Sequence, residues 1–422
     1  MIKKIGLIGL GTVGQGVLKT LKENSSLITR RTSLNIEIKK VCDINRSRGK
    51  VAKQFSLPFT TDPYAIINDP DIDIVIELIG GIEPAYTLVK AALKNKKSVV
   101  TANKALLAKN GKAIFNLAAK KDVSVGFEAS VCGAIPIIKS VSEGLVGCQV
   151  DKIFGILNGT ANYILHKMEK ENISFQKALT QAQEKGLAEQ NPVFDIEGGD
   201  TLHKLCILSY LCYGIWPKLS KVYTEGITKI SLLDILYAKD LKYRIKLLAI
   251  AKRDKKSLDL RVHPVLVPLR HPLSGIPLAY NAVTLYTHPA GELLFFGEGA
   301  GGIPTSSSVV SDIVAIATGN KGFARKAEDI TMVDIKEVKN QYYLRCMIKD
   351  QPGALAKITK VLALSDISIS SVTQKIRSRG KFVPLIMVTH EAREKDLKKA
   401  ISKIDKLSIV QSPSQLIRIE KI

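Results

Sequence analysis

The sequence predicts an α/β protein that combines a Rossmann-type parallel sheet domain, an α+β domain and a C-terminal ferredoxin-like (βαββαβ) domain. Short apolar strands alternate with helical patterns from residue 1 to about 130, which is typical of a parallel sheet with crossover helices. From about 135 to 300, longer helical segments mix with β-rich stretches. Residues 342–422 then follow the order strand, helix, strand, strand, helix, strand.

Length and composition agree with a chain of several domains. With 422 residues, 45% of them hydrophobic, the chain has material for two or three cores without disulfides or metals. The longest strongly apolar stretch, residues 205–216, is shorter than the ~20 residues that cross a bilayer, so we interpret it as a buried helix. The chain opens directly into a strand, so we expect no signal peptide and a cytoplasmic protein. Six cysteines without a C-x-x-C pair predict free thiols.

The formal net charge of +23 raises the question of a nucleic-acid partner, because lysine and arginine release counterions from phosphates. The basic residues form isolated pairs or short clusters, such as 94–97 and 252–256, without aromatic interleaving, a zinc module or a basic tail. We therefore expect solvated lysine faces and attraction of anionic metabolites, and neither nucleic acid nor a membrane as a partner.

The secondary structure is expected in the following order. Strands of the first domain lie at residues 4–8, 36–42, 72–78, 98–101 and 123–128. Further β-rich stretches follow at 260–268 and 280–286, and a small-residue helix at 307–318 is expected to pack back on the first domain. In the tail, helices are expected at 354–364 and 394–404.

The first strand ends in a G-x-G-x-x-G run formed by Gly9, Gly11 and Gly14, and a helix from about 13 to 22 follows. In this motif the first glycine permits a tight turn, the second lets the backbone approach a pyrophosphate, and the third allows close helix packing. The helix N-terminus at Thr12 and Val13 attracts phosphate charge. Strand, turn and helix together predict a dinucleotide site.

The ribose end of that site leaves NAD and NADP open. Asp43 follows the second strand, where a carboxylate accepts hydrogen bonds from the ribose hydroxyls of NAD. Arg46 and Arg48 lie on the following turn, where they suit the 2′-phosphate of NADP, although solvated surface charge explains them equally well. A second glycine-rich turn, residues 297–302 with Gly301, offers further amides to cofactor or substrate. We predict NAD(P) as the cofactor.

Two lysines are candidate catalytic groups. Lys104 follows the strand at 98–101, at the edge where open α/β sheets bind ligands, although an ordinary surface lysine fits that place equally well. Lys204 lies on the first turn of a helix that begins near residue 201, on a face that otherwise turns to a core. Burial and the positive helix end disfavour its charged form and lower its pKa, whereas Asp200 at i−4 opposes them, so Lys204 suits general acid–base work. The alternative is a structural Asp200–Lys204 pair.

Several segments together resemble homoserine dehydrogenase over nearly the whole chain. They are GLIGLGTVG at 6–14, IELIGG at 76–81, TANK at 101–104, EASV at 128–131, GILNGTANYIL at 155–165 and the run from 189 to 204. The resemblance implies reversible hydride transfer between NAD(P)H and L-aspartate 4-semialdehyde, which gives L-homoserine for threonine, methionine and isoleucine biosynthesis.

The resemblance also implies roles for single residues. Lys204 resembles the proton donor to the developing alkoxide, and Lys104 resembles the second lysine near substrate and nicotinamide. Glu189, Asp195 and Asp200 resemble the acids that hold the amino acid and orient the lysines. A proton donor within hydrogen-bond reach of the reacting oxygen is typically worth about 10² to 10⁴ in rate.

The family further holds a sodium ion on backbone oxygens of a loop that corresponds to Glu128, Val131, Gly133 and Ile135, and hard oxygen ligands suit such an ion. The chain departs from the family at two places. Asn191 replaces a common Asp, which affects part of the substrate's polar contact. Residues 132–134 replace a more glycine-rich run in the sodium loop.

The tail resembles an ACT domain, a module that commonly pairs with a copy of itself and binds an amino acid between subunits. The resemblance rests on residues 350–355 and 368–369 together with Gln374, and the D-x-P-G turn offers free amides for a carboxylate at a helix start. We expect an amino-acid effector, L-threonine, at Asp350, Gly353, Ala354, Leu355 and Gln374. A purely dimerising tail is the alternative.

These features divide the chain into an NAD(P)-binding Rossmann domain at 1–134 (completed by about 300–320), a substrate-binding and dimerisation domain at 135–300, a linker at 321–341 and an ACT domain at 342–422. We expect a homodimer or homotetramer. Two rival functions remain. One is another Rossmann amino-acid dehydrogenase, and the other is a non-enzymatic amino-acid sensor that binds nucleic acid, which the ACT-like tail and the positive net charge suggest.

Overall fold

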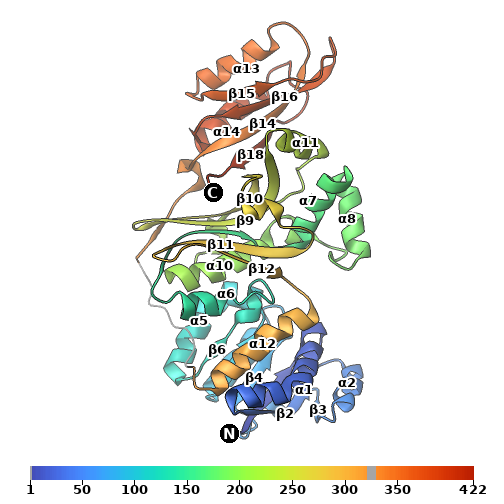
Figure 1. The fold of residues 1–422 in the computed structure, drawn as a ribbon, viewed down its shortest axis with the longest axis vertical. Coiled ribbons are helices and arrows are strands. Elements are labelled where there is room, and N and C mark those ends of the chain that lie inside the picture. The colour runs from blue at the N-terminus through green and yellow to red at the C-terminus, as the bar shows by residue number, and fades with distance from the viewer. Residues whose placement is uncertain (1, 321–328) are drawn as a thin grey trace. The chain divides into compact units, whose positions relative to one another are not determined.

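The computed structural model describes residues 2–320 and 329–422. The chain forms two compact units (Figure 1). The first comprises Met1–Ile153, Asp200–Val222 and Tyr280–Asp329, and the second comprises Phe154–Gly199, Tyr223–Ala279 and Ile330–Ile422. Each unit is thus assembled from segments that are far apart in the sequence, and the two units cut across the domains expected from sequence order.

A six-stranded parallel sheet forms the centre of the first unit. Its strands are β1 (Ile2–Ile8), β2 (Asn35–Cys42), β3 (Phe59–Thr60), β4 (Ile74–Glu77), β5 (Ser98–Thr101) and β6 (Val125–Gly126). They are ordered β3-β2-β1-β4-β5-β6, and all five pairs are parallel. This is the strand order of the dinucleotide-binding α/β fold, and it reverses between β1 and β4, where such sheets bind ligands beyond the strand ends. The predicted Rossmann-type sheet is confirmed.

Helices cover this sheet. They are α1 (Thr12–Thr32), α2 (Gly49–Gln54), α3 (Tyr64–Ile67), α4 (Ala85–Lys94), α5 (Lys104–Lys121) and α12 (Gly302–Ala317). In Figure 1, α12 lies alongside α1, and a Cβ added to Gly16 of α1 would lie 2.5 Å from the carbonyl oxygen of Gly302. Val17 of α1 and Ile313 of α12 belong to one apolar core. The expected return of the helix at 307–318 to the first domain is confirmed.

The rest of the first unit contains α6 (Ile137–Lys139), most of α10 (Gly199–Tyr213), the start of β7 (Gln149–Ile156), and the antiparallel pair β11 (Tyr280–His288) and β12 (Gly291–Glu298). Most of α10 is buried, as expected for the apolar stretch at 205–216. The helix ends earlier, at Tyr213, because Gly214 takes a left-handed conformation with φ +69°. Trp216 beyond it stacks on Tyr210, with ring centroids 4.5 Å apart.

In the second unit, a long antiparallel hairpin of β9 (Tyr243–Asp254) and β10 (Ser257–Pro268) forms the middle of a sheet. The short strands β8 (Tyr223–Thr224) and β13 (Thr331–Met332) pair with β10 in parallel. The helices of this part are α7 (Gly159–Glu171), α8 (Phe175–Glu184), α9 (Val193–Ile196) and α11 (Leu232–Asp240). Strand β13 lies within the predicted linker, of which residues 321–328 lie outside the described residues.

The C-terminal tail continues the sheet of the second unit. Its elements are β14 (Lys339–Lys349), α13 (Ala354–Ala363), β15 (Ile369–Thr373), β16 (Phe382–Thr389), β17 (Ala392–Arg393), α14 (Glu394–Ile404) and β18 (Gln415–Ile419). Apart from the two-residue β17, this is the predicted βαββαβ order. β18 pairs with β14 and also, in parallel, with β10, where Val265 lies opposite Arg418. The tail and the β9–β10 hairpin therefore share one sheet.

Buried ion pairs reinforce this junction. Glu420, which is 1% exposed, accepts a hydrogen bond from Arg261 at 2.7 Å. Arg345 of β14 donates two hydrogen bonds, of 2.7 and 3.0 Å, to the buried Asp234 on α11. Because removal of one partner from a buried pair costs about 3–5 kcal/mol, the tail folds as part of this unit.

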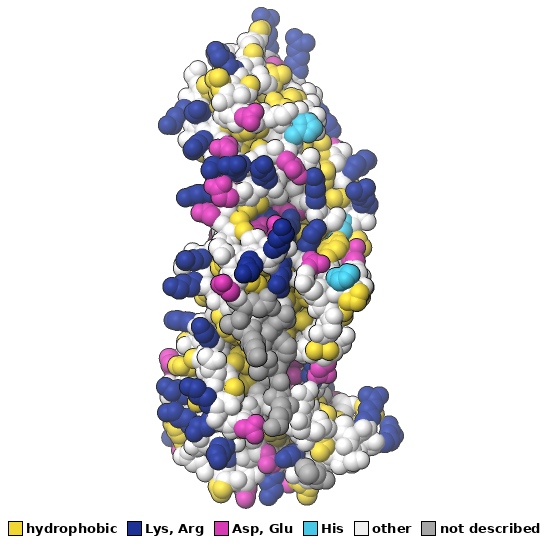
Figure 2. Space-filling view, turned by 90° about the vertical axis from the view of Figure 1, so that its left-hand side faces the viewer, with side chains coloured by type: hydrophobic (Ala, Val, Ile, Leu, Met, Phe, Trp, Pro, Cys, Tyr) yellow, Lys and Arg dark blue, Asp and Glu magenta, His cyan; other side chains and the backbone are white. Residues whose placement is uncertain are grey.

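On the face that Figure 2 presents, Lys and Arg side chains are scattered widely, with Asp and Glu between some of them. This pattern matches the dispersed basic clusters seen in the sequence. Within residues 2–320 and 329–422, the helices are too short or too polar to cross a membrane.

Candidate active site

The glycine-rich loop between β1 and α1 has the form that a pyrophosphate requires. Gly9 has φ +105°, and a Cβ there would lie 2.6 Å from the carbonyl oxygen of Leu78, so only glycine fits. A Cβ on Gly14 would lie 2.0 Å from the carbonyl oxygen of Gly9. Around Gly11, by contrast, a Cβ would meet nothing within 4 Å, so one side of the loop is open.

The first turn of α1 is ready to receive an anion. Gly11 is the N-cap residue, and no side chain caps the helix. The N–H groups of the first turn, at Thr12 and Val13, therefore point away from any intrahelical acceptor, and the helix dipole adds partial positive charge. The residues present fit the dinucleotide group that the sequence predicts, with Gly9, Gly11 and Gly14 around its phosphates.

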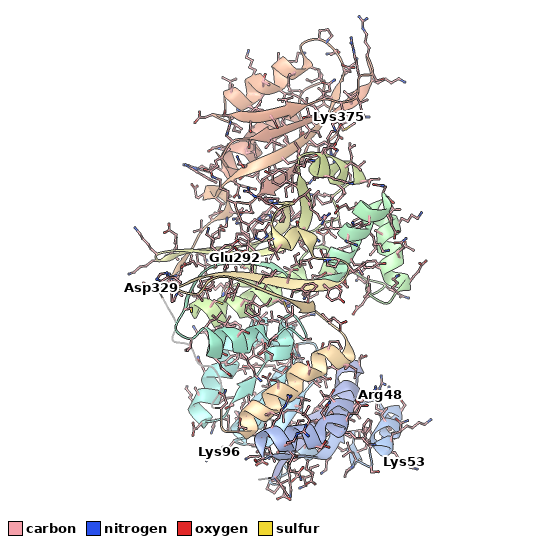
Figure 3. The ribbon with its side chains drawn as sticks, viewed as in Figure 1. Arg48, Lys53, Lys96, Glu292, Asp329 and Lys375 are labelled. Atoms are coloured by element: carbon pink, nitrogen blue, oxygen red, sulfur yellow. The ribbon has the colours of Figure 1, made fainter. Side chains whose placement is uncertain are left out.

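Asp43 lies beside the same loop. Its Oδ2 accepts a hydrogen bond from the Leu10 N–H at 2.8 Å and its Oδ1 accepts one from the Asn45 N–H at 2.9 Å. These bonds fix the carboxylate at the end of β2, next to the glycine-rich loop. Arg46 on the short helical turn that follows is exposed. Arg48, at the end of that turn, is half-buried (Figure 3). Both the acid and the arginines thus follow directly after β2, as the sequence predicts.

The second glycine-rich turn also reaches the cofactor loop. A Cβ on Gly302 would lie 2.9 Å from the backbone oxygen of Thr12 and equally close to its Cγ2. Gly301 has φ +118° and is the N-cap residue of α12, again without a side-chain cap. The predicted cofactor residue Gly301 and the G-x-G-x-x-G loop are therefore brought together from opposite ends of the first unit's sequence.

A buried carboxylate joins the two candidate catalytic lysines. Oδ1 of Asp200 lies 2.6 Å from the Lys104 Nζ, and its Oδ2 accepts a hydrogen bond from the Lys204 Nζ at 2.8 Å. Asp200 is 1% exposed and Lys204 7%, whereas the Lys104 side chain is 39% exposed. A structural pair of Lys204 with Asp200 alone therefore does not describe the site fully. Lys104, 96 positions before Asp200 in the chain, shares the same carboxylate.

This arrangement holds charge in a fixed place. Burial alone would raise the pKa of Asp200, but the ammonium groups of Lys204 and Lys104 outweigh burial and hold the pKa well below its ordinary value. Asp200 is thus an anion that orients two cations, one buried and one reaching solvent. An ammonium that is held in this way can donate a proton to an oxygen that becomes negative during reaction.

A polar network under Lys104 was not anticipated from the sequence. Lys104 is the first residue of α5, whose N-cap Asn103 accepts a hydrogen bond from the Leu106 N–H at 3.0 Å and donates one to the Gly81 carbonyl at 2.6 Å. Glu77, 1% exposed at the end of β4, accepts a hydrogen bond from the Thr101 hydroxyl at 2.6 Å. These bonds tie β4, β5 and the start of α5 together. The only sequence signal was the adjacent position of polar residues at two strand ends.

Two of the predicted substrate acids lie in the second unit. Asn158 donates a hydrogen bond to Asp195 Oδ1 at 2.7 Å and caps α7 by accepting one from the Ala161 N–H at 2.7 Å. Glu189 is exposed on the loop after α8, and so is Asn191, the departure from the family pattern. Asn158, which belongs to the GILNGTANYIL segment, is a positioning residue that the sequence did not single out.

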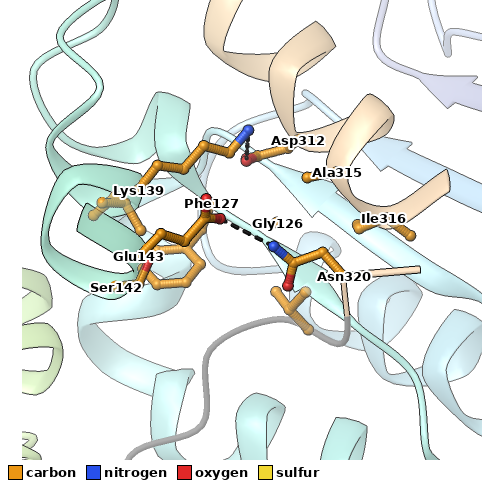
Figure 4. Close-up of a pocket in the computed structure, with 11 residues that line it drawn as sticks. Gly126, Phe127, Lys139, Ser142, Glu143, Asp312, Ala315, Ile316 and Asn320 are labelled. Carbon is orange, nitrogen blue, oxygen red and sulfur yellow. Dashed lines mark hydrogen bonds and ion pairs between the residues drawn. The ribbon is translucent and has the colours of Figure 1, made fainter. Parts of the chain in front are cut away.

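The loop that would hold sodium is organised around a buried acid. Glu128 accepts hydrogen bonds from the Ile138 and Lys139 N–H groups at 2.7 and 2.8 Å, and its own N–H donates to Asp312 Oδ2 at 2.8 Å. Burial and the nearby Asp312 raise the pKa of Glu128 to about 7, and burial raises the pKa of Asp312 to about 6. A cavity of about 90 Å³ borders Asp312, and Lys139 lies 3.5 Å from its carboxylate (Figure 4).

The backbone oxygens of that loop are largely engaged. The Gly133 carbonyl accepts a hydrogen bond from the Ser308 hydroxyl at 2.7 Å, and the Ile135 carbonyl accepts one from the Ile137 N–H at 2.8 Å. The Glu128 carbonyl accepts a longer one from the Val131 N–H at 3.4 Å. Within the described ranges, no group of three or more His, Cys, Asp or Glu side chains is placed to hold a metal. Within those ranges, an ion at this loop would therefore depend on backbone oxygens and not on a cluster of such side chains.

In the tail, the structure brings together the residues predicted for an effector. Asp350 accepts hydrogen bonds from the Ser378 N–H at 2.7 Å and from Gln374 Nε2 at 3.4 Å. Gly353 has φ +78° and is the uncapped N-cap residue of α13. Ala354 is buried and Leu355 is 42% exposed. The side chain of Asp350 thus braces the loop between β15 and β16. At the start of α13 the Ala354 N–H donates to the Gln351 carbonyl at 3.2 Å, and no side chain caps the helix.

Comparisons with known proteins agree with one another. Family models described as "Homoserine dehydrogenase", "Homoserine dehydrogenase, NAD binding domain" and "ACT domain" match residues 136–314, 9–128 and 342–408. A homoserine dehydrogenase of Neisseria gonorrhoeae is 41% identical, over 99% of this chain and 98% of that protein. The crystal structure of a homoserine dehydrogenase from Thiobacillus denitrificans is 42% identical and superposes with a TM-score of 0.93, over 100% and 99% of the two chains.

A more distant solved structure is also that of a homoserine dehydrogenase. A hyperthermophilic archaeal homoserine dehydrogenase, solved in complex with NADPH, is 25% identical with a TM-score of 0.65. The match covers 75% of this chain and 98% of the archaeal one.

Proposed function

The chain belongs to the homoserine dehydrogenase family of oxidoreductases, and from this premise we propose that it interconverts L-aspartate 4-semialdehyde and L-homoserine with NAD(P)H. The observation that carries the proposal is the Asp200 carboxylate, which lies between the ammonium groups of Lys204 and Lys104. When bound, NAD(P)H supplies the hydride that reduces the aldehyde carbon. Lys204 gives its proton to the carbonyl oxygen as negative charge develops there, which yields the hydroxyl of homoserine.

The other residues of the site position the substrate. Asp200 keeps Lys204 charged and oriented, and Lys104, the more exposed lysine, attracts the carbonyl oxygen from the solvent side. Glu189 and Asp195 are proposed to hold the ammonium group of the amino acid, with Asp195 oriented by Asn158. In the reverse direction the uncharged amine of Lys204 takes the hydroxyl proton. We place the reaction in the biosynthesis of threonine, methionine and isoleucine, in the cytoplasm.

The first test is formation of NADH or NADPH from L-homoserine by the purified protein, with NAD and NADP in parallel. Wild type should be active with one of them, and Lys204→Ala should lose about 10²-fold or more in kcat while its affinity for the reduced cofactor is unchanged. Lys97→Met is the matched control, because Lys97 is another buried lysine of the first unit, bonded to the Asp69 and Ile72 carbonyls. If the wild-type protein forms neither NADH nor NADPH, the chain is better explained as another Rossmann amino-acid dehydrogenase or as a non-enzymatic sensor with salt-dependent binding to DNA.

The identity of the cofactor is tested by the same assay. Asp43 favours NAD through its ribose hydroxyls, and Arg46 and Arg48 favour the 2′-phosphate of NADP. Asp43→Asn should lower kcat/KM with NAD far more than with NADP if the acid holds the ribose. If Arg46→Ala and Arg48→Ala lower kcat/KM with NADP and leave kcat/KM with NAD unchanged, the arginines bind the 2′-phosphate of NADP.

We propose L-threonine as an inhibitor at the turn formed by Asp350, Gly353, Ala354, Leu355 and Gln374. Deleting residues 340–422 would also remove partners of buried charges in the rest of the unit, so point variants are the sharper test. Gln374→Ala should weaken inhibition, and Lys360→Ala, at the other end of α13, should not. Inhibition that is unchanged in Gln374→Ala and Asp350→Asn would leave the tail as a purely dimerising module, and light scattering would then decide between dimer and tetramer.

Sodium at the backbone oxygens of Glu128, Val131, Gly133 and Ile135 is proposed from the family resemblance alone. Three of these oxygens accept a hydrogen bond, and each carbonyl keeps a second lone pair that can bind a hard cation. Activity in NaCl should exceed activity in KCl at equal ionic strength. Equal activities would remove sodium from the proposal.

A further inference from the structure

A cavity of about 450 Å³ lies in the second unit, and neither the lysine pair nor the D-x-P-G turn contributes to its lining. Its walls come from β8 and the segment after it on one side and from α14 and β18 of the tail on the other (Figure 1 labels α14 and β18). The volume falls within the range of about 300–1,000 Å³ that is typical of small-molecule sites. Most of its lining residues are polar or charged, so a filled apolar core does not explain it.

One wall of this cavity is built from buried, fixed charges. Arg418, 1% exposed, donates to Glu394 Oε2, Glu225 Oε2 and the Tyr223 hydroxyl, each at 2.9 Å. The Tyr223 ring contacts two cations, with its centroid 4.7 Å from Arg418 Cζ and 4.8 Å from Lys398 Nζ. Because these groups saturate one another, the wall keeps its shape without a ligand.

The mouth of the cavity carries both signs of charge. Lys398 Nζ lies 3.0 Å from Glu394, which is also bound to Arg418, so its charge is only partly compensated. Lys229 is exposed and has no ion pair within the described part of the chain. Glu197 accepts a hydrogen bond from the Thr228 hydroxyl at 2.7 Å through Oε1, and its Oε2 lies over Gly226, where a Cβ would approach it to 2.6 Å. Acidic and basic side chains from both walls thus line one space.

We propose that this cavity binds a small α-amino-acid zwitterion, with its carboxylate at Lys229 and Lys398 and its ammonium group at Glu197. A simple anion would meet the Glu197 carboxylate, and a simple cation would meet the two lysines. A zwitterion satisfies both sides. The site is separate from the effector turn at Asp350 and does not depend on the proposed reaction.

The cavity is connected to the candidate active site through the chain. Glu197 stands between Asp195 and Asp200 in the sequence. The Ile227 N–H, beside Gly226 in the cavity wall, donates to the Ile196 carbonyl at 2.8 Å. An occupant bound to Glu197 therefore restrains residues 195–200. This segment contains Asp195, a proposed substrate acid, and Asp200, which orients both lysines. Occupancy is expected to change the KM for L-homoserine.

The test uses the full-length protein and the standard protein amino acids, one at a time at millimolar concentration. Thermal unfolding selects the amino acid that stabilises most, and equilibrium dialysis with the labelled compound gives its Kd. Lys229→Met and Glu197→Gln should each weaken binding about 10- to 100-fold, which is the loss of one charge-assisted hydrogen bond. Lys395→Met is the control, because Lys395 is on the same helix as Lys398 but pairs with Glu337 outside the cavity.

Three outcomes with amino acids would overturn the proposal. The first is that no amino acid binds, and the second is that binding is unchanged in Lys229→Met and Glu197→Gln. The third is binding that is lost in Gln374→Ala but kept in the cavity variants, which would assign the ligand to the turn. Inorganic phosphate serves as the comparison probe: if it binds and is lost only in Lys229→Met, the cavity takes anions and the zwitterion is wrong.

Discussion

Asp200→Asn is the substitution that tests the arrangement of the site most directly. The change keeps the shape of the side chain and removes the negative charge between Lys204 and Lys104, which lie 2.8 and 2.6 Å away. Lys204 is 7% exposed, so its ammonium group would be left buried without a counter-charge. Loss of one partner from a buried pair costs about 3–5 kcal/mol, and Lys104 adds little because solvent screens it, so we expect a stability loss on the order of 3 kcal/mol.

The effect on catalysis should be larger than the effect on cofactor binding. Without Asp200, burial favours the uncharged amine of Lys204, and the amine is no longer held in one orientation. A misplacement of about 1 Å costs roughly 10²-fold in rate, so kcat for reduction of L-aspartate 4-semialdehyde should fall about 10²-fold or more. The alkaline limit of the reduction rate should also move to lower pH, because the proton to be donated is lost earlier.

Initial rates of NADPH oxidation as a function of pH, urea unfolding and an NADPH binding titration separate these effects. Asp234→Asn is the matched control, since Asp234 is also buried and bound to an arginine, Arg345, but lies outside the candidate site. It should lose stability and keep kcat. If Asp200→Asn loses less than about tenfold in kcat, or if Asp234→Asn loses as much, the carboxylate does not organise the lysines.

Three further predictions follow from the same structure. Gly14→Ala should abolish NADPH binding in a fluorescence titration, because its Cβ would lie 2.0 Å from the Gly9 oxygen. The control Gly144→Ala, whose Cβ would lie in open space, should bind NADPH normally. Normal binding by Gly14→Ala would contradict the role of the loop. Asn103→Ala should lower the free energy of unfolding by about 1 kcal/mol and raise the KM for L-homoserine. Ser174→Ala, which removes the cap of α8, should lower the free energy of unfolding and leave the KM unchanged. Equal kinetic constants for the two variants would refute a positioning role for Asn103. The pKa of Glu128 is raised from 4.5 to about 7, so the folded state binds more protons than the unfolded one between these values and stability falls as pH rises through that window. Urea unfolding of Glu128→Gln at stepped pH should show a flatter dependence, by on the order of 3 kcal/mol across the window, and an unchanged slope would show that Glu128 titrates normally.

Local patterns in the sequence were sufficient for most elements and failed where a distant contact decides. The helix expected at 13–22 continues to Thr32, since the polar side chains of Asn24 and Ser25 bond back to the helix carbonyls instead of ending it. The strand expected at 123–128 is reduced to Val125–Gly126, followed by a 3-10 turn at Glu128–Ser130. The Glu128 N–H leaves the strand to donate to Asp312, which is 184 positions away and invisible to a local pattern.

The sequence by itself determined the glycine loop, the place of Lys104 at a strand end and the i,i+4 pair of Asp200 and Lys204, because turn geometry and helical periodicity act over a few residues. Only the tertiary structure decided that Lys104 shares the Asp200 carboxylate with Lys204, and that Gly302 meets Thr12. Likewise, the pairing of β18 with β10 joins the tail to the second unit and places β18 in the wall of the cavity beside Glu197. These contacts join segments whose separation carries no periodic signal, so sheet order and buried charge pairing, which are properties of the packed chain, fix them.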